Sequence, residues 1–186
     1  VNIRFPMDKF IGIWWSGSEN DVKPAGDGAN GYKALTFHNL GSDYPLYDDL
    51  KAHVFDKGLA AGAGDQHGTA IYNRGLYAAM LVAEAAKTAQ EIHGTSQITP
   101  AMMRDGMEAL EMTEEKMTAL GLPKVGPEFT VSCENHGGNG FAAIGQWDAS
   151  AGEWKLITDY MQSDQDIVQP LIEADSMAYA DEAGIT

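Results

Sequence analysis

Cys133 and His136 are the one thiol and imidazole that lie close together in this sequence. A cysteine acts as a nucleophile when a nearby group stabilises its thiolate, so such a pair could in principle serve hydrolysis. The two residues lie three positions apart at the end of a predicted strand over 129–133, where their side chains would point in different directions. The glycine-rich segment "NHGGNG" predicts a turn, and no obvious oxyanion loop follows. We therefore expect that this protein is not an enzyme. The alternative is an amidase-like or other hydrolase that uses Cys133 and His136.

Metal and cofactor sites have no supporting pattern either. The acidic stretch "EMTEEKM" (111–117) lacks the residue order of an EF-hand calcium loop. The segments "GDGANG" and "AGAGDQHG" lack both the lysine and hydroxyl residue of a P-loop and the strand and helix context of a dinucleotide site. The other histidines are dispersed without a spacing of four residues. They are His38, His53, His67 and His93. We expect no metal and no cofactor.

Trp14 and Trp15 are the residues best suited to ligand binding. They end the apolar run "FIGIWW" (10–15), which predicts a strand, and a long polar loop over 16–31 follows. Successive side chains of a strand face opposite sides, so one tryptophan should point to the core and the other elsewhere. Ligands of open α/β sheets bind outside the carboxyl ends of strands. This position favours an aromatic wall for a ligand, with Ser16 as a hydrogen-bond partner.

Composition restricts the classes of partner. The chain has 186 residues, enough for one domain or two small lobes. Its 12 Lys and Arg against 27 Asp and Glu give a formal net charge of −15, which disfavours nucleic acid and anionic membrane surfaces. No apolar run approaches the roughly 18 residues of a membrane helix. The chain begins at Val1 without a signal-peptide pattern, so we expect its start to reflect truncation or processing.

The hydrophobic pattern predicts an α/β fold with a partly parallel sheet, because helices alternate with short apolar strands. Strands are expected over 10–15, 32–37, 129–133, 141–147 and 153–160, the last two joined as a hairpin. Helices are expected over 44–57, 69–92, 99–111, 113–120 and 166–183. Asp43 should cap the first of these helices, and Pro170 should interrupt the last. Tyr72, in the first turn of the 69–92 helix, is a further candidate for ligand contact.

Three segments carry a family resemblance. They are "FIGIWWSGSENDVKPAGDGANGY", "AIYNRGLYAAMLVAEAAKTA" and "HGGNGFAAIGQWDASAGEWKLITDY". The first is similar to a strand followed by an "AGxxAxG" loop, the second to a "YDA"-type helix, and the third to a closing turn, strand and hairpin. Together they resemble the C-terminal half of the type I periplasmic solute-binding proteins of ABC transporters, in the branched-chain amino acid and amide group. The resemblance covers nearly all of residues 1–160, and none of its motifs is catalytic.

The resemblance implies two doubly wound, Rossmann-like lobes joined by three crossing segments. Residues 1–40 and 139–160 would belong to the C-terminal lobe, residues 41–138 would complete the N-terminal lobe, and residues 161–186 would form a helical tail. The N-terminal half of the family fold would be missing. We therefore expect this chain to expose strand edges and to dimerise, exchange elements or retain a partner.

In function, the resemblance implies the substrate-binding component of an ABC importer. It would be periplasmic and made with a signal peptide in its precursor. It would bind a small organic solute (aromatic, amide or amino-acid-like) between the two lobes and deliver it to the permease subunits in the membrane. The alternative is a ligand-sensing domain of a receptor or regulator with the same fold.

The resemblance also bears on the ligand. Amino-acid binders of this family hold the ligand ammonium with an acidic residue where this chain has Trp14. We therefore expect an aromatic or amide-like solute, bound without that ammonium contact, although Glu19 further along the loop could supply the charge. The aromatic wall from the crossing helix would be Tyr72 or, in another register, Tyr77.

Replacing the thiol tests the absence of catalysis. We expect Cys133→Ser to leave ligand binding intact, because a binding protein needs no nucleophile and His136 is the one candidate base near the thiol. Solute titration of the variant and the parent protein checks this. A loss of binding, or of a hydrolytic activity, would contradict the expectation.

Overall fold

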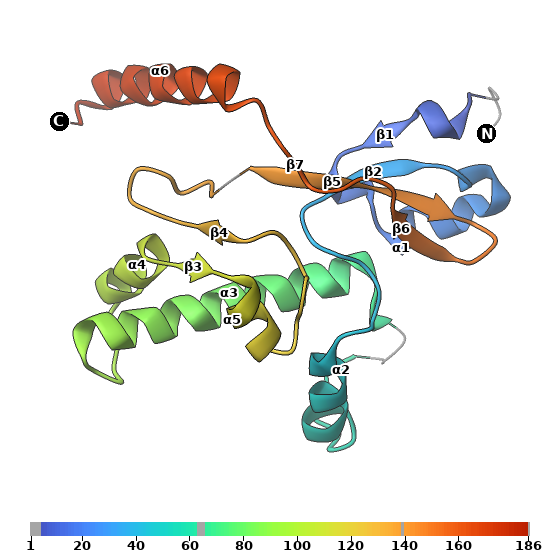
Figure 1. Cartoon of the computed structure of the whole chain (residues 1–186), viewed down its shortest axis with the longest axis horizontal. Helices are drawn as coiled ribbons and strands as arrows, with labels where there is room; N and C mark the ends of the chain where they lie inside the picture. The colour runs from blue at the N-terminus through green and yellow to red at the C-terminus, as the bar shows by residue number, and fades with distance from the viewer. Residues whose placement is uncertain (1–4, 63–65, 139, 186) are drawn as a thin grey trace.

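The computed structural model describes residues 5–62, 66–138 and 140–185, and its centre is a mixed sheet (Figure 1). The strands are β1 (Ile11–Gly12), β2 (Lys33–Thr36), β5 (Phe141–Asp148), β6 (Glu153–Leu156) and β7 (Met161–Gln162). The order is β1-β2-β5-β6, and β7 also pairs with β5. The β1–β2 pair is parallel and the other pairs are antiparallel. The prediction of a mixed α/β fold with a partly parallel sheet is confirmed.

The hairpin of β5 and β6 forms the sheet's core. Trp147 pairs with Trp154 across the two strands, with ring centroids 5.6 Å apart. Alternate residues of β5 are buried, as expected for a strand with one face on a core. These tryptophans pack with Val22, Ala29 and Ala34 in one hydrophobic cluster. The predicted hairpin is confirmed.

The short helix α1 (Glu19–Val22) packs at the sheet through Val22. The next helices along the chain form a second layer beside the sheet (Figure 1). They are α2 (Pro45–Leu50), which continues as a π-helical turn over Lys51–Phe55, α3 (Ala70–His93), α4 (Pro100–Glu108) and α5 (Glu114–Ala119). Thr69 caps α3 by accepting a hydrogen bond from the Tyr72 N–H, and Gly94 ends it in the left-handed conformation. Thr99 caps α4 in the same way. The helix predicted over 69–92 is therefore confirmed, and the helix predicted over 99–111 is present but ends at Glu108.

A second hydrophobic cluster lies among these helices. It includes Tyr77 and Met80 of α3, together with Met112, Met117 and Leu122. Two short strands, β3 (Glu111–Met112) and β4 (Phe129–Thr130), form an antiparallel pair at its side. The chain thus has one apolar cluster at the sheet and another among the helices. The lobe boundaries at residues 40 and 138 stay a prediction.

Several predicted elements differ from the structure. The strand expected over 10–15 is reduced to Ile11–Gly12, and those over 129–133 and 153–160 are also shorter. The cap of α2 is Tyr44 and not Asp43, because Pro45 occupies the first helical position. The short strands β3 and β7 have no hydrophobic pattern long enough to predict them.

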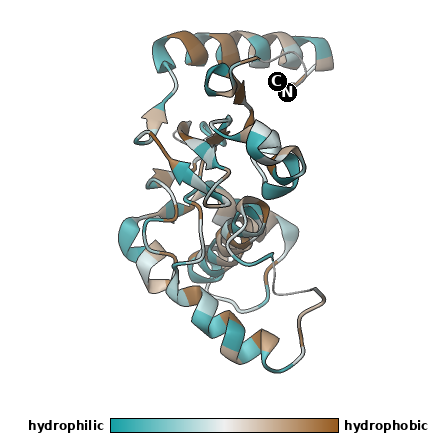
Figure 2. Cartoon of the chain, turned by 90° about the vertical axis from the view of Figure 1, so that its right-hand side faces the viewer, coloured by the Kyte–Doolittle hydropathy of each residue, from teal (hydrophilic) through white to brown (hydrophobic). Residues whose placement is uncertain are grey.

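The last helix, α6 (Gln165–Ala183), stands apart from both layers (Figure 1). It runs through Pro170 without a break, so the predicted interruption is wrong. The proline lies near the helix start, where its ring removes one backbone hydrogen bond without ending the helix. None of the residues of α6 is buried, and Figure 2 shows apolar and polar residues interspersed along this helix.

Asn39 joins the two layers, on the segment that leaves β2 for α2 (Figure 1). Its backbone N–H donates to the carbonyl of Val125, and its side-chain Nδ2 donates to the carbonyl of Lys124. Its Oδ1 accepts a hydrogen bond from the Tyr160 hydroxyl at 3.2 Å. Asn39 therefore bonds both to the segment that contains Lys124 and Val125 and to the segment that contains Tyr160.

His38 precedes Asn39 and is fully buried. Its Nδ1 lies 3.0 Å from the Asn39 carbonyl, so Nδ1 carries the proton and Nε2 is left as an acceptor. Nε2 has no hydrogen-bond partner among the described residues. Burial lowers the pKa of the His38 imidazole and the positive charge of Arg74 lowers it further, while the bond to Asn39 opposes the shift.

Packing between α3 and α4 gives a test of stability. A Cβ at Gly106 would overlap the carbonyl oxygen of Ala85 and the backbone of Ala89, whereas a Cβ at Gly75 would meet nothing. We expect Gly106→Ala to lower the free energy of unfolding by about 1–3 kcal/mol through overpacking. Gly75→Ala, also within a helix, should raise it by about 0.5–1 kcal/mol. Denaturant unfolding of both variants decides, and a Gly106→Ala variant as stable as the parent would contradict the packing.

The buried imidazole predicts acid sensitivity. Because the pKa of His38 is lower in the folded chain, the unfolded chain takes up the proton first as the pH falls below about 6.5. Stability is therefore full above that pH and declines below it. We expect His38→Gln to flatten the decline between about pH 6.5 and 5, while His53→Gln, at an exposed histidine, should retain it. Identical profiles for the two variants in denaturant titrations would contradict the assignment.

Candidate functional site

Trp14 and Trp15 lie in a short 3-10 helix, Trp14–Ser16, and not in a strand. The backbone N–H and the hydroxyl of Ser16 both donate to the carbonyl of Ile13 at 3.0 Å, which closes a turn directly after β1. Both tryptophans are exposed, Trp14 at 42% and Trp15 at 65%. The expectation that one of them points to the core is wrong, because alternation of side chains holds only within a strand.

Ser16 anchors this turn to the sheet. Its hydroxyl accepts a hydrogen bond at 3.0 Å from the hydroxyl of Tyr32, the residue before β2. A Cβ at Gly12 would overlap both hydroxyl groups, so a larger residue there would displace this hydrogen-bonded pair. The Ser16 hydroxyl therefore has two partners within the protein, and its role as a ligand partner stays a prediction.

Side chains from the 14–19 segment and from the start of α3 meet each other. The carboxylate of Glu19 accepts from the N–H of Ala70, with its two oxygens at 3.1 and 3.3 Å. Arg74 donates to the carbonyl of Trp14 at 2.8 Å, and its guanidinium carbon lies 5.4 Å from the centre of the Trp15 ring. The acidic residue and the tryptophans named from the sequence are thus brought to the first turns of α3.

Arg74 is a site residue that the sequence did not indicate. Its guanidinium also lies 5.2 Å from the ring centre of Phe37, so it packs between two aromatic side chains. Burial lowers its pKa. Its Nε and Nη1 are buried and have no hydrogen-bond partner among the described residues. A single arginine on a helix carries no sequence signal, because its contacts depend on how α3 meets the sheet.

Tyr72 and Glu19 line one cavity of about 480 Å³ at the start of α3. The tyrosine ring stacks on Tyr47, at 6.1 Å between centroids and 27° between planes, and lies 5.2 Å from the His67 ring. The other lining residues are small, apolar or neutral polar groups. They are Ser18, Asn20, Gln66, Thr69, Ile71, Gly75 and Leu76. The cavity offers one carboxylate, one aromatic ring and an apolar wall, which suits binding of a small organic molecule.

Tyr77, the other register of the aromatic wall, is a core residue. Its side chain is 7% exposed within the helical cluster, and burial raises its pKa to about 12. It borders an apolar cavity of about 400 Å³ that Glu19 and Tyr72 do not line. Tyr72 is therefore the tyrosine that shares a cavity with Glu19.

Cys133 and His136 show no arrangement for catalysis. The thiol is exposed. The Nε2 of His136 lies 3.3 Å from a carboxylate oxygen of Glu108, which orients the imidazole toward that residue. An activated cysteine needs its base within hydrogen-bond reach, and no such contact between Cys133 and His136 is found among the described residues.

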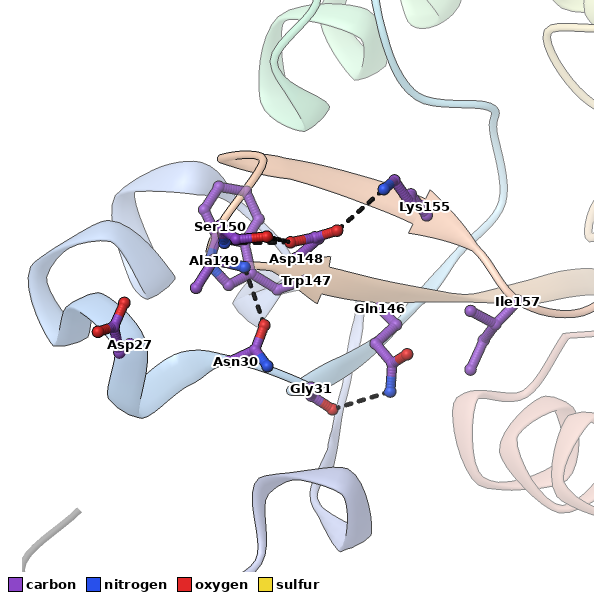
Figure 3. Close-up of a pocket in the computed structure, with 10 residues that line it drawn as sticks. All are labelled: Asp27, Asn30, Gly31, Gln146, Trp147, Asp148, Ala149, Ser150, Lys155 and Ile157. Atoms are coloured by element: carbon purple, nitrogen blue, oxygen red, sulfur yellow. Dashed lines mark hydrogen bonds and ion pairs between the residues drawn. The ribbon is translucent and has the colours of Figure 1, made fainter.

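A larger and more polar cavity, of about 560 Å³, lies at the β5–β6 hairpin (Figure 3). Asp148 accepts from the backbone and hydroxyl of Ser150, from the Ala151 N–H and from Lys155 Nζ. These bonds hold the pKa of the Asp148 carboxyl far below its usual range. Asn30 accepts from Ala149 across the same cavity. These polar groups of the cavity bond to each other, so they stabilise the hairpin turn and have little hydrogen-bonding capacity left for a ligand.

Across residues 5–62, 66–138 and 140–185, no group of three or more His, Cys, Asp or Glu side chains could hold a metal ion. In the same described ranges, no helix has the length and hydropathy needed to cross a bilayer.

No protein-family model matches this chain, and no curated protein matches it. Its structure is similar to the crystal structure of an ABC transporter permease from the Pseudomonas fluorescens group, with a TM-score of 0.90 and 33% identity. That match covers 100% of this chain and 44% of the other chain. It is also similar to a branched-chain amino acid ABC transporter from Thermus thermophilus with bound valine, with a TM-score of 0.64 and 20% identity.

The second match covers 86% of this chain and 41% of the Thermus chain. This chain therefore spans less than half of the length of either protein. At 20% identity the second likeness concerns the fold alone. The two matches show that this chain has a fold found as part of two ABC transporter proteins.

Proposed function

We propose that this chain is part of the substrate-binding component of an ABC importer, and that it binds a small organic solute in a cleft between two lobes. The observation that carries the proposal is the cavity that Glu19 and Tyr72 share at the start of α3. Trp14 and Trp15 are exposed and do not line this cavity, but the Trp14 carbonyl accepts a hydrogen bond from Arg74, two residues after Tyr72. The likeness to two ABC transporter proteins supports the link to transport. The component would be periplasmic, would interact with the permease subunits and would catalyse no reaction.

The contacts of the site favour an aromatic or amide-like solute over an α-amino acid held by its ammonium group. Trp14 provides a flat apolar face and no anion at the position where the family has its carboxylate. Glu19 carries a charge, but both of its oxygens face the N–H of Ala70 at the start of α3. There the carboxylate stabilises the positive end of the helix dipole, so it has a structural partner without a ligand.

Tyr72 provides the test of this site. We expect Tyr72→Ala to weaken solute binding about tenfold, since an aromatic stacking partner contributes about 0.5–1.5 kcal/mol beyond its buried area. Tyr179→Ala is the matched control, because Tyr179 lies exposed on α6, outside the cavity. Benzoate, a short amide and leucine are titrated into the full-length protein, and binding is followed by tryptophan fluorescence and calorimetry.

Two outcomes of this titration would contradict the proposal. Equal affinities in the Tyr72→Ala and Tyr179→Ala variants would remove Tyr72 from the site. Micromolar binding of leucine that is abolished by Glu19→Gln would show that the carboxylate holds an ammonium group, and the proposed solute class would then be wrong.

A further inference from the structure

Arg74 of α3 carries a positive charge that no carboxylate of the described residues neutralises. The other arginine in the described ranges is Arg104 on α4, and its hydrogen bond to Asp105 and the nearby charge of Glu108 raise its pKa. For Arg74 the structure gives one hydrogen bond, to the Trp14 carbonyl, and burial alone lowers its pKa. Charges that are taken out of water normally have a partner of opposite sign. In a chain with 27 Asp and Glu against 12 Lys and Arg, this arginine without a carboxylate is unusual.

Two of the hydrogen-bond donors of Arg74 are buried and unused. Nη2 donates to the Trp14 carbonyl, whereas Nε and Nη1 have no partner among the described residues. The rings of Trp15 and Phe37 lie 5.4 and 5.2 Å from the guanidinium carbon. Aromatic rings attract a cation but accept hydrogen bonds only weakly, so these N–H groups still lack an acceptor. Guanidinium N–H donors bind carboxylate oxygens particularly well, because both the charge and the planar shape match.

Trp15 covers the guanidinium and is not itself held in a core. Its ring is 65% exposed and contacts the Arg74 guanidinium and the Trp14 ring. A side chain with so few neighbours changes rotamer readily. Rotation of Trp15 therefore opens the guanidinium to a ligand and leaves two exposed indole rings beside it.

This position differs from the cavity of Glu19 and Tyr72. Successive residues of an α-helix are turned by about 100°, so Arg74 and Tyr72 project about 160° apart from α3. Tyr72 stacks on Tyr47 and lines the cavity, whereas Arg74 bonds to the turn after β1 and does not line it. The two sides of α3 therefore offer different groups to a ligand.

We propose that Arg74 and the Trp14–Ser16 turn form a second ligand site, which takes the carboxylate of an aromatic acid. Nε and Nη1 of Arg74 donate to the carboxylate, which supplies the anion that this arginine lacks. The ring of the acid packs against Trp14 and Trp15. An inorganic anion would leave these indole rings unused, so an aromatic acid is favoured over phosphate. The site goes beyond the proposed solute cavity and does not depend on it.

Benzoate is the probe, and benzamide is the uncharged molecule of similar shape. The sequence has three arginines, so protein labelled isotopically in arginine gives at most three Nε–H signals in a nuclear magnetic resonance spectrum. Arg74→Lys and Arg104→Lys identify the signals by their loss. We expect benzoate to shift the Arg74 signal and to leave the Arg104 signal unchanged, whereas benzamide should shift neither. This measurement uses the parent protein, so it does not depend on the stability of a variant.

Calorimetric titration provides the second measurement. We expect benzoate to bind at least about tenfold more tightly than benzamide, since a hydrogen bond to a charged group is worth roughly that factor or more. Arg74→Gln should remove this preference. Arg104→Gln is the matched control and should keep it, because the Arg104 guanidinium pairs with Asp105 and Glu108. Circular dichroism should show the same fold in both variants.

Three results would overturn the proposal. They are an Arg74 signal that benzoate does not move, equal affinities for benzoate and benzamide, and an equal loss of benzoate binding in the Arg74→Gln and Arg104→Gln variants. Tyr72→Ala separates the two sites, because it should leave the benzoate preference intact. Benzoate binding that Tyr72→Ala abolishes, with the Arg74 signal unmoved, would instead place benzoate in the solute cavity and contradict the second site alone.

Discussion

The position of α3 depends on a small set of hydrogen bonds that join it to α2 and to the segment that leaves β2. Asn73 of α3 is 2% exposed, and its Nδ2 donates to the carbonyl of Gly41 at 2.7 Å. Its Oδ1 accepts from the hydroxyl of Tyr47 at 2.6 Å. With Asn39, these bonds fix the first turns of α3 against the segment that leaves β2. The removal of one partner would leave a buried polar group without a hydrogen bond, which costs about 1–3 kcal/mol.

The position of the candidate site follows from this junction. Tyr72 and Arg74 flank Asn73 in the sequence, so the bonds that place Asn73 also set where the two neighbours project. Arg74 then reaches the tryptophan turn, while Tyr72 faces the cavity with Glu19. A site made from one loop and one helix requires that the two keep their relative position, and here backbone and amide hydrogen bonds provide it.

Local signals in the sequence predicted the long elements well. Thr69 and Thr99 cap their helices, and Gly94 ends α3. Each of these residues acts on the backbone groups at its own helix end, so no contact with a distant part of the chain is needed. The prediction of a strand ending at Trp15 was wrong, because a local hydrogen bond there competes with strand pairing. The residues have strand propensity, but Ser16 offers the Ile13 carbonyl two hydrogen bonds that close a turn instead.

The site was predicted in part. Its aromatic residues and Glu19 could be named because their types suit a ligand and they lie next to predicted element ends. The choice between Tyr72 and Tyr77 could not be made, since the two are five residues apart and both fit the periodicity of an amphipathic helix. Arg74 could not be found at all, because its aromatic partners come from residues 15 and 37.

The isolation of α6 has a consequence for how this chain opens. A helix of 19 residues that buries none of its side chains is held mainly by its own backbone hydrogen bonds, and Pro170 removes one of these. Its local free energy of opening is therefore much smaller than that of the buried α3. Amide hydrogens of α6 would exchange with solvent long before those of the sheet, and proteases would first cut the chain there.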